Sequence, residues 1–167
     1  MRTEIGSLGR ITSNAARYPI TLVLLIAVLI PPEAHAITCR VTVFAIDFGI
    51  YMPLTTTHVD VTGQIDVQCQ AQPGSFTVVI GPGVSGDQLA RTLTAGGPNV
   101  LNYNLYRDAA RTQIWGDGTP PTLVVSGVRP GKGRPTFYNY PIYGRIFANQ
   151  APNPGIYSDN LLVTVLF

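Results

Sequence analysis

The chain has 167 residues, of which 46% are hydrophobic and only 12% are charged, and its formal net charge is +2 at pH 7. From residue 37 onward the charges nearly balance, with eight Lys or Arg against seven Asp and no Glu. This balance gives no support to nucleic-acid binding. The scarcity of Lys and the absence of Glu, both good helix formers, weaken a helical interpretation of this part.

The first 36 residues have the three parts of a secretory signal peptide. Arg2, Arg10 and Arg17 form a basic n-region, and residues 20–30 form an apolar h-region. The sequence Ala34-His35-Ala36 then provides small residues around a cleavage site. We therefore predict a signal-peptide helix that is removed by cleavage after Ala36.

The alternative for this segment is a retained membrane anchor. Eleven apolar residues span only about 17 Å as a helix, whereas the hydrocarbon core of a bilayer is about 30 Å thick. Pro31 and Pro32 also prevent the helix from extending. We expect no permanent membrane anchor and one mature domain of ordinary size, residues 37–167.

Two strands are predicted around the only two cysteines, Cys39 and Cys69. In residues 63–69, Ile65, Val67 and Cys69 alternate with polar residues, and residues 39–43 alternate in the same way. Each cysteine therefore falls on the apolar face of its strand. Because an even number of cysteines in an exported chain indicates a disulfide, we predict a Cys39–Cys69 bond worth about 3–4 kcal/mol.

Other apolar or alternating runs predict four more strands, at residues 76–80, 101–106, 136–147 and 161–167. Pro141 suggests that the third of these is an edge strand or contains a bulge. The connections are rich in Gly and Pro, which is typical of an all-β sandwich or barrel. The last run is apolar on both faces except at Thr164, so it must be covered on both sides by its own domain or by a partner.

The mature sequence has no constellation typical of catalysis. Its only histidine, His58, lies in a polar run, and both cysteines are assigned to the disulfide. With no Glu, a catalytic carboxylate pair would have to consist of two Asp residues. We therefore expect a protein that is not an enzyme, with no cofactor and no metal site.

Two apolar features could serve either packing or contact with a partner. Trp115 precedes Gly116-Asp117-Gly118, whose glycines suit a tight turn, so we favour a core position for the indole. Tyr51, Met52 and Leu54 flank Pro53 in an apolar loop. They are candidates for an exposed apolar contact, although packing inside the domain is the favoured alternative.

Several motifs extend over almost all of the chain from Cys39 to Phe167. They are Phe48-Gly49-Ile50-Tyr51, Arg91-Thr92-Leu93, the stretch from Leu101 to Thr112, Trp115-Gly116-Asp117-Gly118, Tyr143-Gly144-Arg145-Ile146 and the turn from Pro154 to Asp159. Each motif is weak alone, but together they are specific. They resemble the spore coat protein U domain.

The resemblance implies an incomplete immunoglobulin-like β-sandwich of the pilin type, assembled by the archaic chaperone–usher pathway of Gram-negative bacteria. Pilins of this type lack one strand. A periplasmic chaperone supplies that strand first, and a neighbouring subunit then replaces it by β-strand addition. The implied partners are a periplasmic pilus chaperone, an usher and a neighbouring pilin subunit that supplies a donor strand.

The resemblance also implies a location and a contact surface. The chain would pass through the periplasm and function at the cell surface or outside the cell, in a pilus or a coat. In related pilins the chaperone pairs with the C-terminal strand. The expected contact residues are therefore Leu161, Val163, Val165 and Phe167.

One feature departs from a polymerising pilin. Cleavage after Ala36 leaves only Ile37 and Thr38 before Cys39, whereas a donor strand needs about ten residues. We expect a tip or terminal subunit in adhesion or biofilm formation, which accepts a strand but donates none. A stand-alone spore-coat or extracellular matrix protein of the same fold and a small carbohydrate-binding β-sandwich module are the alternatives.

Overall fold

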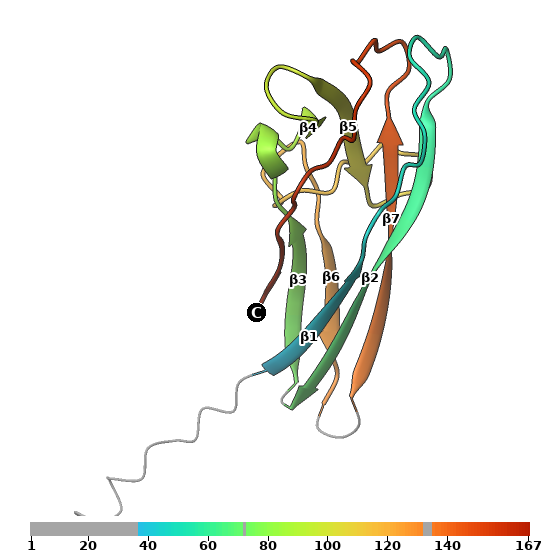
Figure 1. Ribbon diagram of the computed structural model, residues 1–167. Helices are drawn as coiled ribbons and strands as arrows, with labels where there is room; N and C mark the ends of the chain where they lie inside the picture. Colours follow the sequence, from blue (N-terminus) through green and yellow to red (C-terminus); the bar gives the residue numbers. More distant parts are fainter. Residues whose placement is uncertain (1–36, 72, 132–134) are drawn as a thin grey trace, which may run out of the picture. The chain divides into compact units, whose positions relative to one another are not determined.

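The computed structural model describes residues 37–71, 73–131 and 135–167, so the predicted signal peptide lies outside the described residues. Eight strands run through this part of the chain (Figure 1). They are β1 (Ile37–Phe44), β2 (Val59–Ala71), β3 (Gly74–Ile80), β4 (Arg91–Thr94), β5 (Val100–Tyr106), β6 (Val125–Arg129), β7 (Thr136–Ile146) and β8 (Val163–Leu166). A short 3-10 helix spans Gly83–Ser85. None of the helical structure described here is long and apolar enough to cross a membrane.

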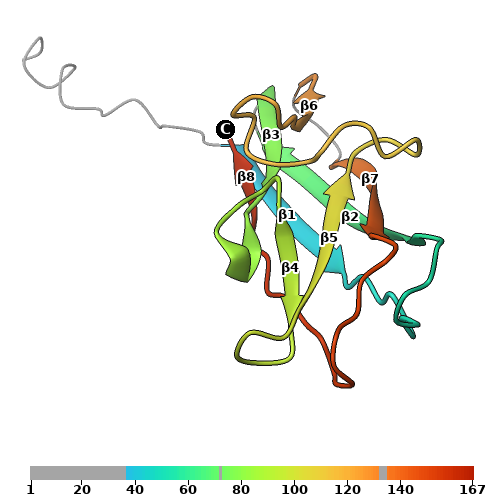
Figure 2. The same ribbon diagram turned by 90° about the horizontal axis from the view of Figure 1, so that it is seen from above.

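The strands form two antiparallel sheets. The larger sheet has the order β1-β2-β7-β5-β4, and the smaller sheet has the order β6-β3-β8. Seen from above, β8 lies on the same side of the molecule as β1, and β6 lies on the same side as β7 (Figure 2). The predicted all-β sandwich of immunoglobulin-like type is thereby confirmed.

The β1–β2 pair has the register that the alternating sequence predicts. Cys39 lies directly opposite Cys69, and the two residues form a disulfide with their Cα atoms 4.1 Å apart. Further along the pair, Val41 lies opposite Val67. Because side chains alternate across a strand, these residues share the face that points into the sandwich. The prediction of a Cys39–Cys69 disulfide is confirmed.

The core lies between the two sheets and contains Trp115. The indole is completely buried, and its Nε1 donates a hydrogen bond of 3.0 Å to the carbonyl oxygen of Val78 on β3. Tyr140 packs edge-on against it, with the ring centroids 6.3 Å apart. The preference for a core tryptophan is therefore correct, because the indole finds both apolar neighbours and an acceptor for its N–H.

Strand β7 departs from the expectation for Pro141. Pro141 lies inside a strand that occupies the middle of its sheet, not a sheet edge. However, β7 pairs with β2 along its whole length and with β5 only from Tyr143 to Ile146. Among the described residues, the half of β7 that contains Pro141 therefore has a strand partner on one side only. A proline is tolerated there because a missing N–H on the other side breaks no ladder.

Candidate functional site: the groove between β1 and β8

Strand β8 pairs on one side with β3, and no other described strand pairs with it. The amide of Gly81 donates a 2.8 Å hydrogen bond to the carbonyl oxygen of Leu162, so the backbone of Leu162 faces β3. In an antiparallel ladder the direction of the backbone groups alternates along the strand. The N–H and C=O groups of Leu161, Val163 and Val165 therefore point away from β3, toward the unpaired edge.

The side chains of these three residues point into the sandwich. Leu161, Val163 and Val165 pack against the core but remain only partly buried. Phe167, the fourth predicted contact residue, follows β8 and has 66% of its surface exposed. The structure thus brings three of the four residues together as one edge, and it places Phe167 at the exposed end of that edge.

Strand β1 provides a second unpaired edge, because β2 is its only partner among the described strands. Its inward-facing side chains are poorly covered compared with those opposite them. Val43 is 49% exposed, although its cross-strand partner Ile65 is completely buried. Phe44, the last residue of the strand, follows Val43 on the other face and is 50% exposed. Apolar surface on the inner side of a sheet normally has a second layer over it, and here that layer is incomplete.

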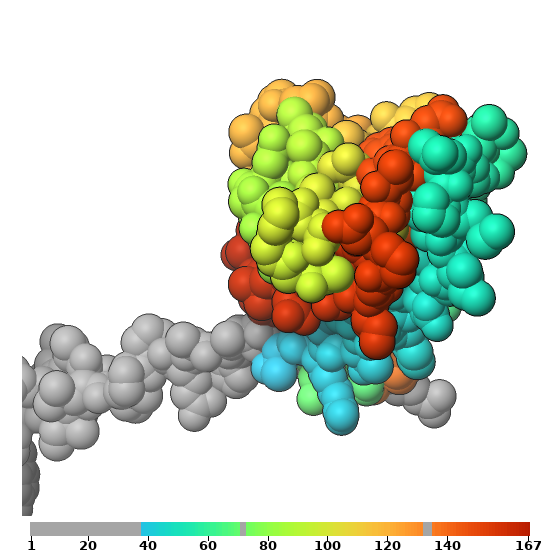
Figure 3. All heavy atoms as spheres, turned by 45° about the horizontal axis from the view of Figure 1, so that its top comes forward, coloured from blue at the N-terminus to red at the C-terminus, as the bar shows by residue number. Residues whose placement is uncertain are grey.

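A groove of about 770 Å³ lies between the two edges. Its walls are formed by residues 43–51, at the end of β1 and after it, and by residues 152–161 and Val163, before β8 and at its start. Its floor consists of core side chains from both sheets, including Ile80, Leu101 and Ile146. In Figure 3 the segment before β8 (red) and β1 (light blue) reach the same face of the molecule. The groove has an apolar floor and is bordered by two unpaired strand edges, which are the features that receive an extended segment.

The wall before β8 is held in place by Asp159. One carboxylate oxygen of Asp159 accepts a 2.6 Å hydrogen bond from the hydroxyl of Tyr103, and the other accepts a 2.8 Å bond from the amide of Val84. Burial, together with the bond to Asp159, raises the pKa of Tyr103, so its hydroxyl remains a donor. A β-bridge between Thr94 and Ser158 also fixes this segment against the edge of β4.

One end of the groove is anchored by the buried Arg91. Its Nη2 donates to the carbonyl oxygens of Ile80, Gly81 and Trp115, at 3.2, 2.9 and 2.9 Å. Its Nη1 donates a 2.7 Å bond to the side-chain oxygen of Asn104. Burial lowers the pKa of Arg91, but the carbonyl dipoles around the guanidinium replace much of the lost hydration. Arg91 thus joins β4 to the end of β3, next to the residues that pair with β8.

The apolar loop residues predicted as an exposed contact have different environments. Met52 and Leu54 are 68% and 67% exposed. Tyr51 is half-buried, and its hydroxyl donates to the carbonyl oxygen of Phe147 and accepts from the amide of Gln150. The structure therefore exposes Met52 and Leu54 and uses Tyr51 to hold the loop.

Several residues of this region were not singled out from the sequence. Val43 and Phe44 looked like ordinary residues of an amphipathic strand, and only the unpaired edge of β1 makes them part of a groove. Ile156, which lies in the loop before β8 and is 92% exposed, was overlooked because it is isolated among Pro and Gly. His58 lies outside the groove, where its Nδ1 accepts a 3.0 Å hydrogen bond from the amide of Ala148.

Two of the solved structures that are similar to this chain are pilus proteins. One is the CsuC–CsuE chaperone–tip adhesion subunit pre-assembly complex from archaic chaperone–usher Csu pili of Acinetobacter baumannii, with 20% identity and a TM-score of 0.55. The similarity covers 79% of this chain but only 40% of that chain. The other is HdaB, the minor tip subunit of the E. coli Hda pilus, with 15% identity, a TM-score of 0.39, and coverage of 75% of this chain and 79% of that chain. The first similarity, at 20% identity, describes the fold alone.

The sequence itself identifies the family. No curated protein matches the chain in sequence. The family model of the spore coat protein U domain, however, matches residues 26–164, which include all of β1 to β7 and the groove-lining segment before β8. Because this match covers far more than half of the chain, the chain belongs to the spore coat protein U domain family.

Proposed function

We propose that this chain is a secreted, non-catalytic subunit of an archaic chaperone–usher surface fibre, and that it accepts a partner strand in the groove between β1 and β8. The observation that carries the proposal is the pair of unpaired edges on either side of an apolar groove of about 770 Å³. An added strand would satisfy the outward backbone groups of β8 and cover Val43 and its neighbours at the same time.

The physical gain from such an addition comes from two sources. Backbone hydrogen bonds to Leu161, Val163 and Val165 would provide affinity that is independent of the donor sequence. Alternate side chains of the donor would enter the groove and bury apolar surface, at about 25 cal/mol for each Å² removed from water. The first donor would be a periplasmic chaperone, which an usher would exchange for the strand of a neighbouring subunit.

We further propose that the chain occupies the tip or the end of the fibre. Strand β1 begins at Ile37 and is paired with β2 over its whole length, from Ile37 opposite Ala71 to Phe44 opposite Gln64. If the signal peptide is cleaved after Ala36, the residues that remain are used within this domain's own sheet. Such a subunit could receive a strand but would have none to donate.

The exposed apolar loops suggest the adhesive surface of such a subunit. Met52 and Leu54 lie in the loop between β1 and β2, and Ile156 lies in the loop between β7 and β8. The two loops are tied together, since the amide of Leu54 donates a 2.8 Å bond to the carbonyl oxygen of Gln150. An apolar surface formed by joined loops is suited to contact with another surface in adhesion or biofilm formation.

The proposal is tested by expressing the full chain in a periplasm with and without a chaperone of its pathway, and by measuring soluble monomer and amide hydrogen exchange. The chaperone should increase the yield of soluble protein and slow exchange at Val163 and Val165. Val163→Asp places a charge in the groove and should abolish this effect. Leu162→Asp is the matched control, because the Leu162 side chain is 73% exposed and lies outside the groove.

A different outcome would favour the other candidate functions. If the chain folds alone with an ordinary melting transition and no chaperone or donor peptide changes exchange at Val163, the proposed strand addition is wrong. The chain would then be a stand-alone coat or extracellular matrix protein, or a sugar-binding module if it also binds a glycan panel.

A further inference from the structure

The sandwich has another edge strand, β6, on the side opposite the groove, and side chains cover its backbone groups. Strand β6 pairs with β3 on one side, and no described strand pairs with its other side. Such an edge would normally display a row of free N–H and C=O groups that can recruit another strand. The backbone groups of Ser126 and Val128 face this edge, because alternate residues of an antiparallel strand face away from the neighbour, and Val124 directly precedes the strand.

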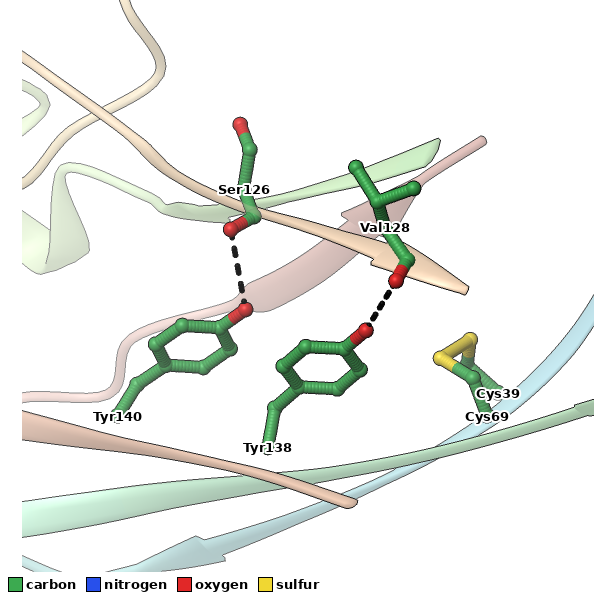
Figure 4. Close-up of a disulfide and its surroundings, with 6 residues drawn as sticks. All are labelled: Cys39, Cys69, Ser126, Val128, Tyr138 and Tyr140. Atoms are coloured by element: carbon green, nitrogen blue, oxygen red, sulfur yellow. Dashed lines mark hydrogen bonds between the residues drawn. A yellow bond between two sulfur atoms is a disulfide. The ribbon is translucent and has the colours of Figure 1, made fainter. Parts of the chain in front are cut away.

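The carbonyl oxygens of these three residues accept hydrogen bonds from side chains of the larger sheet. The hydroxyl of Tyr138 donates to the carbonyl of Val128, and the hydroxyl of Tyr140 donates to that of Ser126 at 3.2 Å (Figure 4). Arg107, which directly follows β5, donates to the carbonyl of Val124 from its Nη1 at 2.7 Å. The row of acceptors on this edge is therefore occupied.

The two tyrosines are held in position for this task. Both lie on β7, and their rings are parallel within 5°, with centroids 6.0 Å apart. Tyr138 also packs edge-on against Phe76, and Tyr140 packs edge-on against Trp115. Because the rings are fixed between core side chains, their hydroxyls are directed at β6 with little remaining rotational freedom.

Two prolines add to the closure of this side. Pro130 follows β6 at the next outward position, and it has no N–H to offer an incoming strand. Pro141 lies in the half of β7 that pairs only with β2 among the described strands. On the other side of the sandwich, no described side chain donates to the outward carbonyls of Val163 and Val165. The outward carbonyl oxygens are therefore occupied by side chains at the β6 edge and left open at the β8 edge.

We propose that Tyr138, Tyr140 and Arg107 close the β6 edge against strand addition, so that a partner strand is accepted only beside β8. This inference rests on the proposed function for its biological meaning, but it concerns a different edge and can fail independently. Its physical basis is competition for acceptors. An incoming strand would have to displace three side-chain donors, two of them on rings packed against the core, before it formed a ladder.

The test compares the wild-type full chain with the double variant Tyr138→Phe, Tyr140→Phe, which keeps both rings and removes both hydroxyls. Sedimentation over a range of concentrations measures self-association, and amide hydrogen exchange shows which edge is used. The variant should associate at roughly tenfold lower concentration than the wild type. Its association should slow exchange at Ser126 and Val128, whose amides face the opened edge.

Two further variants keep the test decisive. Ser85→Ala removes a hydroxyl that donates to the carbonyl oxygen of Pro82 at 3.0 Å, away from both β6 and the groove, and it should behave as wild type. Adding Val128→Pro to the double variant removes an outward amide and should restore the wild-type association. If the double variant does not fold, as judged by Trp115 fluorescence, Tyr138→Phe alone replaces it.

The inference is overturned if the tyrosine variants associate no more than the wild type, or if their association protects only Val163 and Val165. The latter result would leave the proposed function intact, because it would place all association at β8. Failure of the chaperone to protect Val163 and Val165 in the wild type would instead refute the proposed function. That failure would not affect the comparison of amide exchange at Ser126 and Val128 between the wild type and the tyrosine variants.

Discussion

Replacing Arg91 with Met should destabilise the sandwich severely. The guanidinium is completely buried and donates hydrogen bonds to the carbonyl oxygens of Ile80, Gly81 and Trp115 and to the side-chain oxygen of Asn104. Ile80, Trp115 and Asn104 are themselves at most 1% exposed, so water cannot easily replace the lost donors. Met is close to the length of the arginine stem, and the new cavity should therefore be small.

The magnitude follows from the three buried acceptors. Each acceptor left without a donor costs about 1–3 kcal/mol. Part of this loss is offset, because the variant no longer has to desolvate a charged guanidinium, the same effect that lowers the pKa of Arg91. We expect a net loss of about 3–5 kcal/mol in the free energy of unfolding, which is a large fraction of the stability of an ordinary domain.

Urea unfolding with the disulfide intact measures this loss. Trp115 is the only tryptophan of the chain, so its fluorescence reports on the core, and far-UV circular dichroism provides a second signal. With a slope of about 1.5 kcal/mol/M, the midpoint should fall by about 2–3 M. Arg40→Met, at an exposed position on β1, is the control and should change stability by about 0.5 kcal/mol or less. A midpoint shift for Arg91→Met no larger than that of the control would refute the reasoning.

Three other predictions concern the disulfide and two charged residues. Changing Cys39 and Cys69 to Ala should lower the unfolding free energy by about 3–4 kcal/mol, because the bond joins residues 30 apart in sequence; an unchanged urea midpoint would contradict this. The hydrogen bond from Arg145 lowers the pKa of Asp60, so this pair stabilises the fold near neutral pH, and the effect is lost as the pH falls through the folded-state pKa. Asp60→Asn should therefore lower the free energy of unfolding at pH 7 by less than about 1 kcal/mol, because the pair is partly exposed, and by less at strongly acidic pH; equal losses at both pH values would exclude this explanation. Arg129 is 1% exposed, and its side-chain nitrogens have no hydrogen-bond partner in the described part of the chain. Arg129→Met should therefore raise the free energy of unfolding by about 1 kcal/mol or more, seen as a higher urea midpoint, and a lower midpoint would disprove an unpaired charge.

Much of the strand content was predictable because alternation is a local property. The runs around Cys39 and Cys69 predicted two neighbouring strands with inward cysteines, and β1 and β2 pair with these residues directly opposite each other. Pairing partners are less predictable, since they depend on residues far apart in the chain. Strands β4 and β6 are short, and Gly127 interrupts the pattern of β6, so neither produced a clear signal in the sequence.

The candidate site was also predictable only in part from the sequence. The doubly apolar run at the C-terminus predicted a strand that must be covered on both sides, and this followed from the sequence because exposed apolar surface is unfavourable in water. The tertiary structure covers only the inner face of this strand, because Leu161, Val163 and Val165 pack against the core whereas Leu162 and Leu166 are 73% and 51% exposed. Sheet order places the unpaired edges of β1 and β8 beside one groove.

The chain by itself determined a disulfide-linked, all-β domain with an apolar C-terminal strand, because these features depend on residue type and spacing along the sequence. The tertiary structure decided which sheet edges remain open. The hydroxyls of Tyr138 and Tyr140 reach carbonyl oxygens of β6, and those residues lie 10 and 14 positions away in the sequence and in the other sheet. Such contacts exist only after the two sheets have packed, because hydrogen bonds between side chains and a distant backbone require the final register of both strands.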